Sequence, residues 1–312
     1  ALIKINGKKC ITVPFTADSV DEITVGFDGN GEMRFDNVEL FNVFDYADYV
    51  PTPVPVNDDG YYVGMSVCSL WREGSHYGWD WIRPFTEIEP VIGYYDEGNP
   101  ESMDWEIKYL TEHGIKNYMT CWYPLSNNTP IKKPRMSEAL HDGYFNAKYS
   151  DKITFSLMYE NSGCHTDSHK TDFMNNVFPL WMDWYFSDPR YCRITEDGKE
   201  YIFLTIYQYL YFLDMCYTDA VLLEYNDYGD LYLKSQYQPS GNTPNATVTA
   251  ACASAVEMLN WMEQQIIDAG YADGLIVVYG GSTQTEAAYK TMSQMGGDGI
   301  ILYAWGKTAC DV

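Results

Sequence analysis

The sequence predicts an α/β fold, a TIM-type (β/α)8 barrel that is preceded by a fragment of a β-sandwich. Two observations support the barrel: six short apolar runs, and helix-like stretches between most of them. The runs are Tyr61–Cys68, Ile115–Trp122, Ile153–Glu160, Tyr201–Gln208, Gly274–Tyr279 and Gly299–Trp305. Strands that alternate with helices are typical of βα units around a parallel sheet. A closed barrel needs eight strands, so either two strands are missing after the sixth or the barrel is incomplete as it stands.

Three stretches between the strands carry helix signals. In the first, Asn99 is a good N-cap, Pro100 suits the first helical position, and Gly114 ends the helix. The other two helices are expected at residues 249–269 and 283–295. We interpret all three as the exterior of the barrel and expect no binding role for them.

The amino-terminal segment has a different pattern. Residues 1–48 contain short strand-like runs separated by tight turns, which indicate the C-terminal part of a β-rich, jelly-roll carbohydrate-binding-like module. Residues 49–57 carry three prolines within five positions and predict a semi-rigid linker. The barrel then spans residues 58–312, and within it the Tyr-rich residues 209–244 are expected to be irregular and could roof a cleft.

Composition excludes several classes of function. The formal net charge is −24, which repels phosphate backbones and argues against nucleic acid. No apolar run is long enough for a membrane span. No G-x-S-x-G, P-loop or dinucleotide fingerprint occurs, which argues against an esterase, a kinase and a dehydrogenase. We expect no cofactor. The module and linker suggest an extracellular or cell-surface protein, and the chain looks like a fragment of a longer one.

The eight cysteines include no C-x-x-C pair, and their spacing matches neither a zinc site nor a dense disulfide framework. Cys68 and Cys121 end successive predicted strands, so a disulfide between them and a pair of buried thiols are both open. Downstream, His165 and His169 are four residues apart and could bind a metal if helical. Without a third ligand a solvated loop is favoured, and we predict no metal.

The carboxyl ends of barrel strands build the active site, and here they carry residues suited to sugars. Glu160 ends the third strand and is our candidate general acid; a structural, salt-bridged glutamate is the alternative. Most glycosidases use two carboxyl groups, and the candidates for the second are Glu73, Asp80 and Asp96, or a residue beyond 312. Candidate substrate-binding residues are Trp71, Trp79, Trp81, Tyr95, Trp122, Tyr123, Asn161, Gln208 and Trp305.

The loop after the first strand allows two interpretations. It holds three tryptophans and two carboxylates within residues 71–81. That composition suits a sugar subsite, because flat aromatic rings pack against sugar C–H surfaces. It equally suits a loop that is anchored by buried tryptophans with solvated acids.

Several motifs together resemble the glycoside hydrolase family 99-like barrels. They are Gly93-Tyr-Tyr-Asp96 before Pro100, His113-Gly114-Ile115 before a strand ending Trp122-Tyr123, Phe155-Ser-Leu-Met-Tyr-Glu-Asn161, Tyr185-Phe186, Asp188-Pro-Arg-Tyr191 and Gly198-Lys199. The resemblance covers residues 61–305 and implies a (β/α)8 barrel that acts on glycans. The family's hydrolase branch contains endo-α-mannosidases, and a sister group is labelled as O-antigen glycosyltransferases. This chain departs from the pattern at Tyr159-Glu160-Asn161, where many relatives have Trp-Ala-Asn.

We therefore expect a glycoside hydrolase that acts on a complex polysaccharide or glycan by carboxylate acid/base catalysis. The alternatives are a non-catalytic glycan-binding protein on the same scaffold, since a fold does not determine function, and a glycosyltransferase. Two carboxyl groups that face one cleft would favour the enzyme over the binding protein.

Overall fold

The computed structural model describes residues 50–57, 60–72, 78–90, 92–124, 134–225, 231–280 and 285–301. The chain divides into two compact units, Ala1–Tyr49 and Val50–Val312. The β-rich module predicted for residues 1–48 lies outside the described residues. In the second unit, the Val50 carbonyl accepts a hydrogen bond from the Tyr149 hydroxyl at 3.0 Å, and the Val54 N–H donates to Glu112 at 3.2 Å. The described part of the predicted linker therefore packs against the βα unit.

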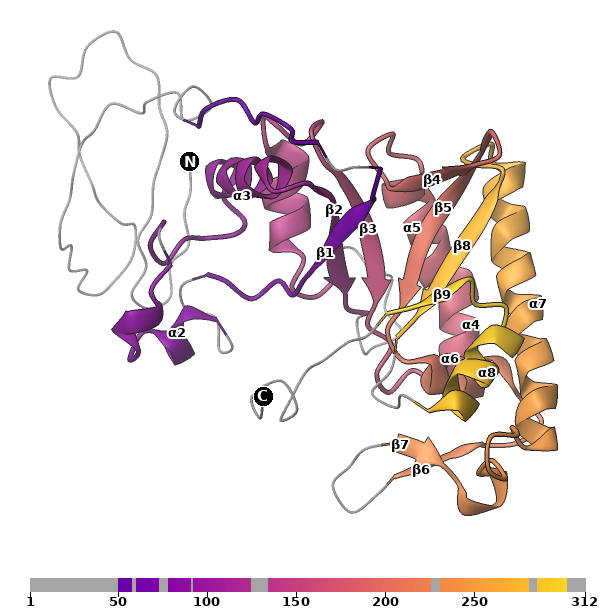
Figure 1. The fold of residues 1–312 in the computed structure, drawn as a ribbon. Coiled ribbons are helices and arrows are strands. Elements are labelled where there is room, and N and C mark those ends of the chain that lie inside the picture. The colour runs from indigo at the N-terminus through magenta and orange to yellow at the C-terminus, as the bar shows by residue number, and fades with distance from the viewer. Residues whose placement is uncertain are drawn as a thin grey trace, which may run out of the picture. The chain divides into compact units, whose positions relative to one another are not determined.

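A parallel sheet forms the centre of the second unit (Figure 1). Its strands follow the order β1-β2-β3-β5-β8-β9, and every neighbouring pair along this path is parallel. Chain order and spatial order thus agree, as in a (β/α)8 barrel that is open after six strands. This confirms the α/β prediction and all six strands. They are β1 (Val63–Val67), β2 (Ile115–Trp122), β3 (Thr154–Tyr159), β5 (Lys199–Ile206), β8 (Gly274–Tyr279) and β9 (Gly299–Ile300), with β4 (Arg193–Glu196) antiparallel to β5.

Helical segments connect most of the strands. The three predicted helices are present as α3 (Pro100–Glu112), α7 (Ala246–Asp268) and α8 (Glu286–Gln294). The Asn99 side chain accepts from the Glu101 N–H at 2.9 Å, as the N-cap prediction requires. The shorter helical segments are α2 (Trp79–Ile82), η1 (Thr86–Ile88), η2 (Ala139–Gly143), η3 (Tyr144–Asn146), α4 (Asp167–Asp172), η4 (Phe173–Val177), α5 (Phe178–Trp181), η5 (Met182–Phe186), α6 (Tyr209–Cys216) and η6 (Ser235–Tyr237). Among the described residues, no helix is both long and apolar enough to cross a membrane.

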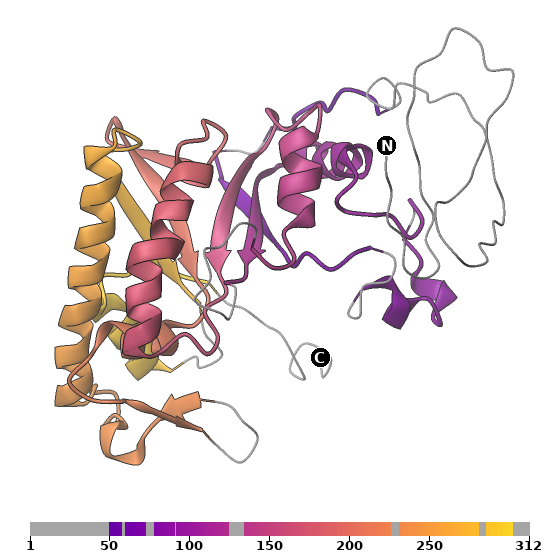
Figure 2. The ribbon, with the colours of Figure 1, turned by 180° about the vertical axis from the view of Figure 1, so that it is seen from behind.

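Alternation along the strands gives the sheet two different faces. On β2, Tyr118 and Trp122 belong to the main core, whereas Met119 and Cys121 belong to a separate small cluster. Helices α5 and α7 cover the face of the main core, as Figure 2 shows from behind. We call the opposite side the inner face. Its cluster consists of Met119, Cys121 and Met158 with Cys68, Tyr123, Phe203, Tyr207 and Ile301 packed against them.

The prediction that residues 209–244 are irregular is wrong for much of the segment. It begins with helix α6, and strands β6 (Leu223–Tyr225) and β7 (Leu231–Leu233) form an antiparallel pair. Tertiary packing explains the helix, because six of its eight residues are buried. The β6–β7 pair lies beyond the carboxyl ends of the strands in Figure 1.

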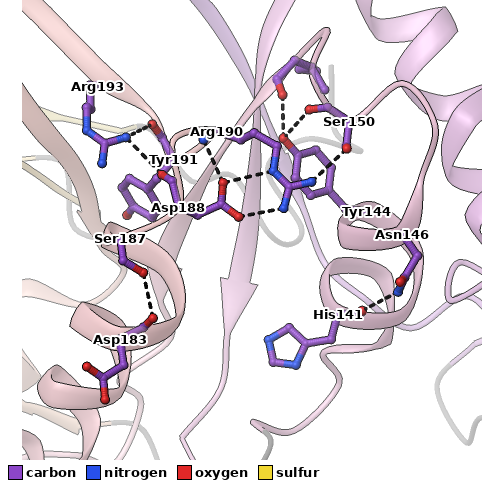
Figure 3. A network of polar contacts seen from close by, with 11 residues as sticks. His141, Tyr144, Asn146, Ser150, Asp183, Ser187, Asp188, Arg190, Tyr191 and Arg193 are labelled. Atoms are coloured by element: carbon purple, nitrogen blue, oxygen red, sulfur yellow. Dashed lines mark hydrogen bonds and ion pairs between the residues drawn. The ribbon is translucent and has the colours of Figure 1, made fainter. Parts of the chain in front are cut away.

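A network of polar contacts holds the amino end of β3 (Figure 3). The Arg190 guanidinium donates to both carboxylate oxygens of Asp188, at 3.0 and 2.7 Å, and to Ser150 Oγ at 2.8 Å. It also lies 5.5 Å from the centre of the Tyr144 ring. The Phe155 N–H donates to the Arg190 carbonyl at 3.1 Å. Because this network is at the amino end of the strand, we assign it to stability.

Candidate functional site

Four strand exits bring the candidate site together. Cys68 follows β1, Tyr123 follows β2, Glu160 follows β3, and Tyr207 follows β5. Three of them pack in the inner-face cluster, and the fourth, Glu160, follows Met158 of that cluster by two positions along β3. The residues converge because the carboxyl ends of parallel strands meet at one edge of a sheet.

Glu160 lies where the sheet opens toward solvent. Its N–H continues the ladder by donating to the Trp122 carbonyl at 3.0 Å. Its side chain is partly exposed and accepts a hydrogen bond from the Ser162 hydroxyl. The structure gives it no ion-pair partner among the described residues. The carboxylate is therefore held by a neutral donor at the carboxyl end of β3.

Glu160 lines a cavity of about 270 Å³ together with a second carboxylate, Asp172. Asp172 is the last residue of α4, and its Oδ1 accepts from Asn176 Nδ2 at 2.6 Å. The lining of the cavity thus includes two acidic side chains. The cavity is lined by Tyr123, Pro124, Arg135, Tyr159, Glu160, Ser162, Gly163, Cys164, His169, Asp172 and Val177.

The sequence reasoning missed Asp172. The signal that could have found it is the helix start at Thr166, whose side chain contacts His169 Nδ1 at 2.7 Å and forms a capping box. A helix from that point places Asp172 three residues after His169, on the same side. His169 also lines the cavity, and burial, followed by the nearby His165, lowers its pKa. This favours the neutral imidazole.

Of the predicted histidine pair, His165 contacts a buried aspartate. His165 Nδ1 lies 3.2 Å from Asp214 Oδ2, and the Asp214 side chain is almost fully buried. Asp214 Oδ1 also accepts from the Leu222 N–H at 2.6 Å. Burial raises the pKa of Asp214 despite these contacts. Within the described part of the chain, no group of three His, Cys, Asp or Glu side chains is arranged to hold a metal.

The loop after β1 is anchored by its aromatic residues. Trp79 is only 3% exposed, its ring centre lies 4.5 Å from that of Trp71, and its indole N–H donates to the Tyr95 carbonyl. Asp96 is exposed and accepts from the Gly98 N–H at 2.8 Å, which stabilises the turn before α3. Trp71 and Tyr95 remain partly exposed. The side chains of Glu73, Asp80, Trp81 and Trp305 lie outside the described residues.

Two further predicted binding residues have structural roles here. Trp122 is 2% exposed and lies in the core, where its indole N–H donates to the Tyr185 hydroxyl at 3.1 Å. Asn161 is 0% exposed; its amide donates to the Gln208 carbonyl and accepts from the Gln208 N–H, both at 2.9 Å. Asn161 therefore joins the exits of β3 and β5, and we reassign it from sugar binding to positioning. The Gln208 side chain is partly exposed beside Tyr207.

Two glutamates near the β1 exit, Glu97 (buried) and Glu106 (partly exposed), were also missed. Glu97 is 3% exposed and accepts a 2.5 Å hydrogen bond from Ser69 Oγ. Burial raises its pKa to about 7, and burial likewise raises the pKa of Glu106 to about 7. Glu97 lies in a Gly-rich turn and Glu106 within a helix, so neither follows a strand, which was the signal used to choose candidates.

Cys68 and Cys121 are both free thiols, which answers the question that their spacing left open. Cys68 Sγ is also hydrogen-bonded to the Tyr123 hydroxyl at 2.9 Å. Burial is the main cause that raises the pKa of Tyr123, so its hydroxyl keeps its proton. Tyr123 thereby connects the thiols to the cavity that it lines.

No family model matches the chain, and no curated protein matches it either. Two solved structures of the GH99 endo-α-mannosidase from Bacteroides thetaiotaomicron are similar to it. The complex with BIS-TRIS-propane is 13% identical, covers 79% of this chain and 84% of its own, and has a TM-score of 0.36. The other is 13% identical, covers 70% of each chain, and has a TM-score of 0.30. Because both TM-scores are below 0.5, we take the fold from this chain's own strand order and the site from its own residues.

Proposed function

We propose that the protein is a glycoside hydrolase that acts on a complex polysaccharide or glycan by carboxylate acid/base catalysis. One observation carries the proposal: Glu160 and Asp172 line the same cavity at the carboxyl ends of the strands. Most glycosidases use two carboxyl groups, one to protonate the leaving oxygen and one to attack the sugar or activate water. A lone glutamate would instead favour binding without hydrolysis.

The surroundings of the two carboxylates also suit a sugar. The cavity, of about 270 Å³, is slightly smaller than the range of about 300–1,000 Å³ that is usual for ligand sites. Tyr123 brings an aromatic ring and a hydroxyl to the lining of this cavity, and His169 and Arg135 bring further polar groups to it. We assign Glu160 as the first catalytic carboxyl group and Asp172, in place of Asp96, as the second.

The test begins with a hydrolysis screen of the 312-residue chain on a panel of α- and β-linked glycans, with released reducing sugar as the readout. On any substrate found, Glu160→Gln and Asp172→Asn should each lower turnover by about 10²–10⁴-fold, as expected for the loss of a proton-transferring group. Binding of the same glycan, measured by calorimetry, should remain largely intact, because both replacements keep the size of the side chain.

Glu196→Gln is the matched control, because Glu196 is exposed on β4 and pairs with the amino end of β5. Its turnover should equal that of the parent chain. A fully active Glu160→Gln variant would overturn the assignment. Glycan binding without hydrolysis by the parent chain would favour the non-catalytic alternative.

A further inference from the structure

The exits of β1 and β2 place two thiols side by side on the inner face. The strands are parallel with Val67 opposite Thr120, so the next residue on each strand is Cys68 and Cys121. The two side chains are packed in the same cluster, and both are free thiols. Neighbouring strands lie about 4.8 Å apart, within the Cα separation of about 4.4–6.8 Å that a disulfide spans. We propose that Cys68 and Cys121 are a redox-active dithiol that closes reversibly to a disulfide.

The two thiols differ in exposure and pKa, as suits a pair in which one thiol attacks an external disulfide and the other resolves the mixed disulfide. Cys68 is partly exposed, whereas Cys121 is 4% exposed. Hydrogen bonds to its sulfur, first from Cys121 and then from Tyr123, outweigh burial and the nearby Glu160 charge and lower the pKa of Cys68 to about 6. The hydrogen bond with Cys68, followed by burial, raises the pKa of Cys121. Cys68 is therefore the attacking thiol, since the thiolate is the nucleophile.

The remaining described cysteines have no comparable arrangement. Burial raises the pKa of Cys164 to about 11 and that of Cys252 to about 12. It also raises the pKa of Cys216 and Cys192. Buried thiols of this kind are unreactive at neutral pH. Among the cysteines that the structure describes, reaction should therefore be selective for the pair at the strand exits.

Oxidised glutathione is a sufficient oxidant. The Cys68 thiolate attacks one sulfur of its disulfide, forms a mixed disulfide and releases one glutathione thiolate. Cys121 then loses its proton and attacks the Cys68 sulfur, which releases the second glutathione. Two protein thiols are oxidised to one disulfide, one oxidised glutathione is reduced to two thiols, and the two protons lost by the protein end on them.

Formation of the disulfide would affect the cavity through Tyr123. A disulfide takes the Cys68 sulfur toward Cys121, which we expect to alter its 2.9 Å hydrogen bond with the Tyr123 hydroxyl. Tyr123 lines the cavity beside Glu160. Oxidation should therefore lower the affinity of the cavity for its ligand. This consequence rests on the proposed function, whereas the formation of the disulfide does not depend on it.

The test is incubation of the native 312-residue chain with oxidised glutathione, followed by alkylation after denaturation and mass spectrometry of the tryptic fragments. Fragments 35–72 and 117–132 each contain one cysteine, Cys68 and Cys121 respectively. They should become linked to each other, the number of alkylated thiols should fall by two, and dithiothreitol should reverse both changes.

Variants separate the two steps. Cys121→Ser should accumulate glutathione on fragment 35–72 without a link, and Cys252→Ser, which alters a distant buried thiol, should form the link like the parent chain. The proposal is overturned if the parent chain keeps both thiols alkylatable, or carries only a glutathione adduct on Cys68, or forms the link only after unfolding in urea. None of these readouts depends on hydrolysis.

Discussion

We predict that Glu97 makes the free energy of unfolding decrease as the pH rises, and that Glu97→Gln removes this effect. The side chain is 3% exposed, accepts from Ser69 Oγ, and takes further hydrogen bonds from the backbone of Leu70 and Trp71. Burial outweighs these bonds and raises the pKa from 4.5 to about 7. Glutamine keeps the shape and most of the acceptor contacts but cannot ionise.

The linkage between proton binding and folding determines the sign and the size of this pH dependence. Between pH 4.5 and 7 the folded protein holds the Glu97 proton and the unfolded chain does not, so the free energy of unfolding decreases as the pH rises through this window. The change from 4.5 to about 7 corresponds to about 3 kcal/mol, of which about 2–3 kcal/mol falls between pH 5 and 8. The parent chain should therefore lose about 2–3 kcal/mol more than Glu97→Gln over that range.

The assay is urea unfolding of both proteins at pH 5, 6, 7 and 8, followed by tryptophan fluorescence. Glu106 also has a raised pKa, but it is present in both proteins, so to first order its contribution cancels in the difference. Glu257→Gln changes an exposed residue of α7 and should leave the pH dependence of the parent unchanged. Parallel curves for the parent and Glu97→Gln, or a parent that gains stability relative to the variant as the pH rises, would refute the reasoning.

Three other substitutions test single structural roles by the same unfolding measurement. Asn161→Ala should cost about 2 kcal/mol or more, because it leaves the backbone N–H and C=O of Gln208 without their partner; an unchanged midpoint would contradict this role. Arg190→Lys should lower the free energy of unfolding by about 1–3 kcal/mol, since lysine cannot reproduce the bidentate contact with Asp188. Full stability would show that the pair is dispensable. Asn99→Ala should cost about 1 kcal/mol as a lost N-cap, whereas Asn99→Asp should retain most of the stability; equal losses in the two variants would argue against capping.

Local patterns in the sequence determined most of the elements around the site. The apolar run before Glu160 identified β3, and the strand exit placed Glu160 at the carboxyl edge of the sheet. Asn99 and Gly114 bounded α3 correctly, and Gly114 adopts the φ of 77° that such a helix end favours. These features depend on neighbours along the chain, so periodicity and capping chemistry were enough to predict them.

Tertiary structure decided which residues meet. Asp172 reaches the cavity of Glu160 only through the path of the chain from β3 into α4. Asn161 looked suited to a sugar hydroxyl until its amide was found bonded to the Gln208 backbone, 47 positions away. Glu97 gave no signal as an isolated acid, because its pKa depends on a burial that only packing creates.

The sequence alone therefore determined the alternation of strands and helices, the strand exits and Glu160 as the leading acidic candidate. Only the tertiary structure brought Asp172 to the cavity of Glu160, placed Cys68 beside Cys121, and distinguished aromatic anchors from exposed rings. The physical reason is that hydrophobic periodicity reports which face of an element is buried. The register and order of strands from distant parts of the chain determine what that face is buried against.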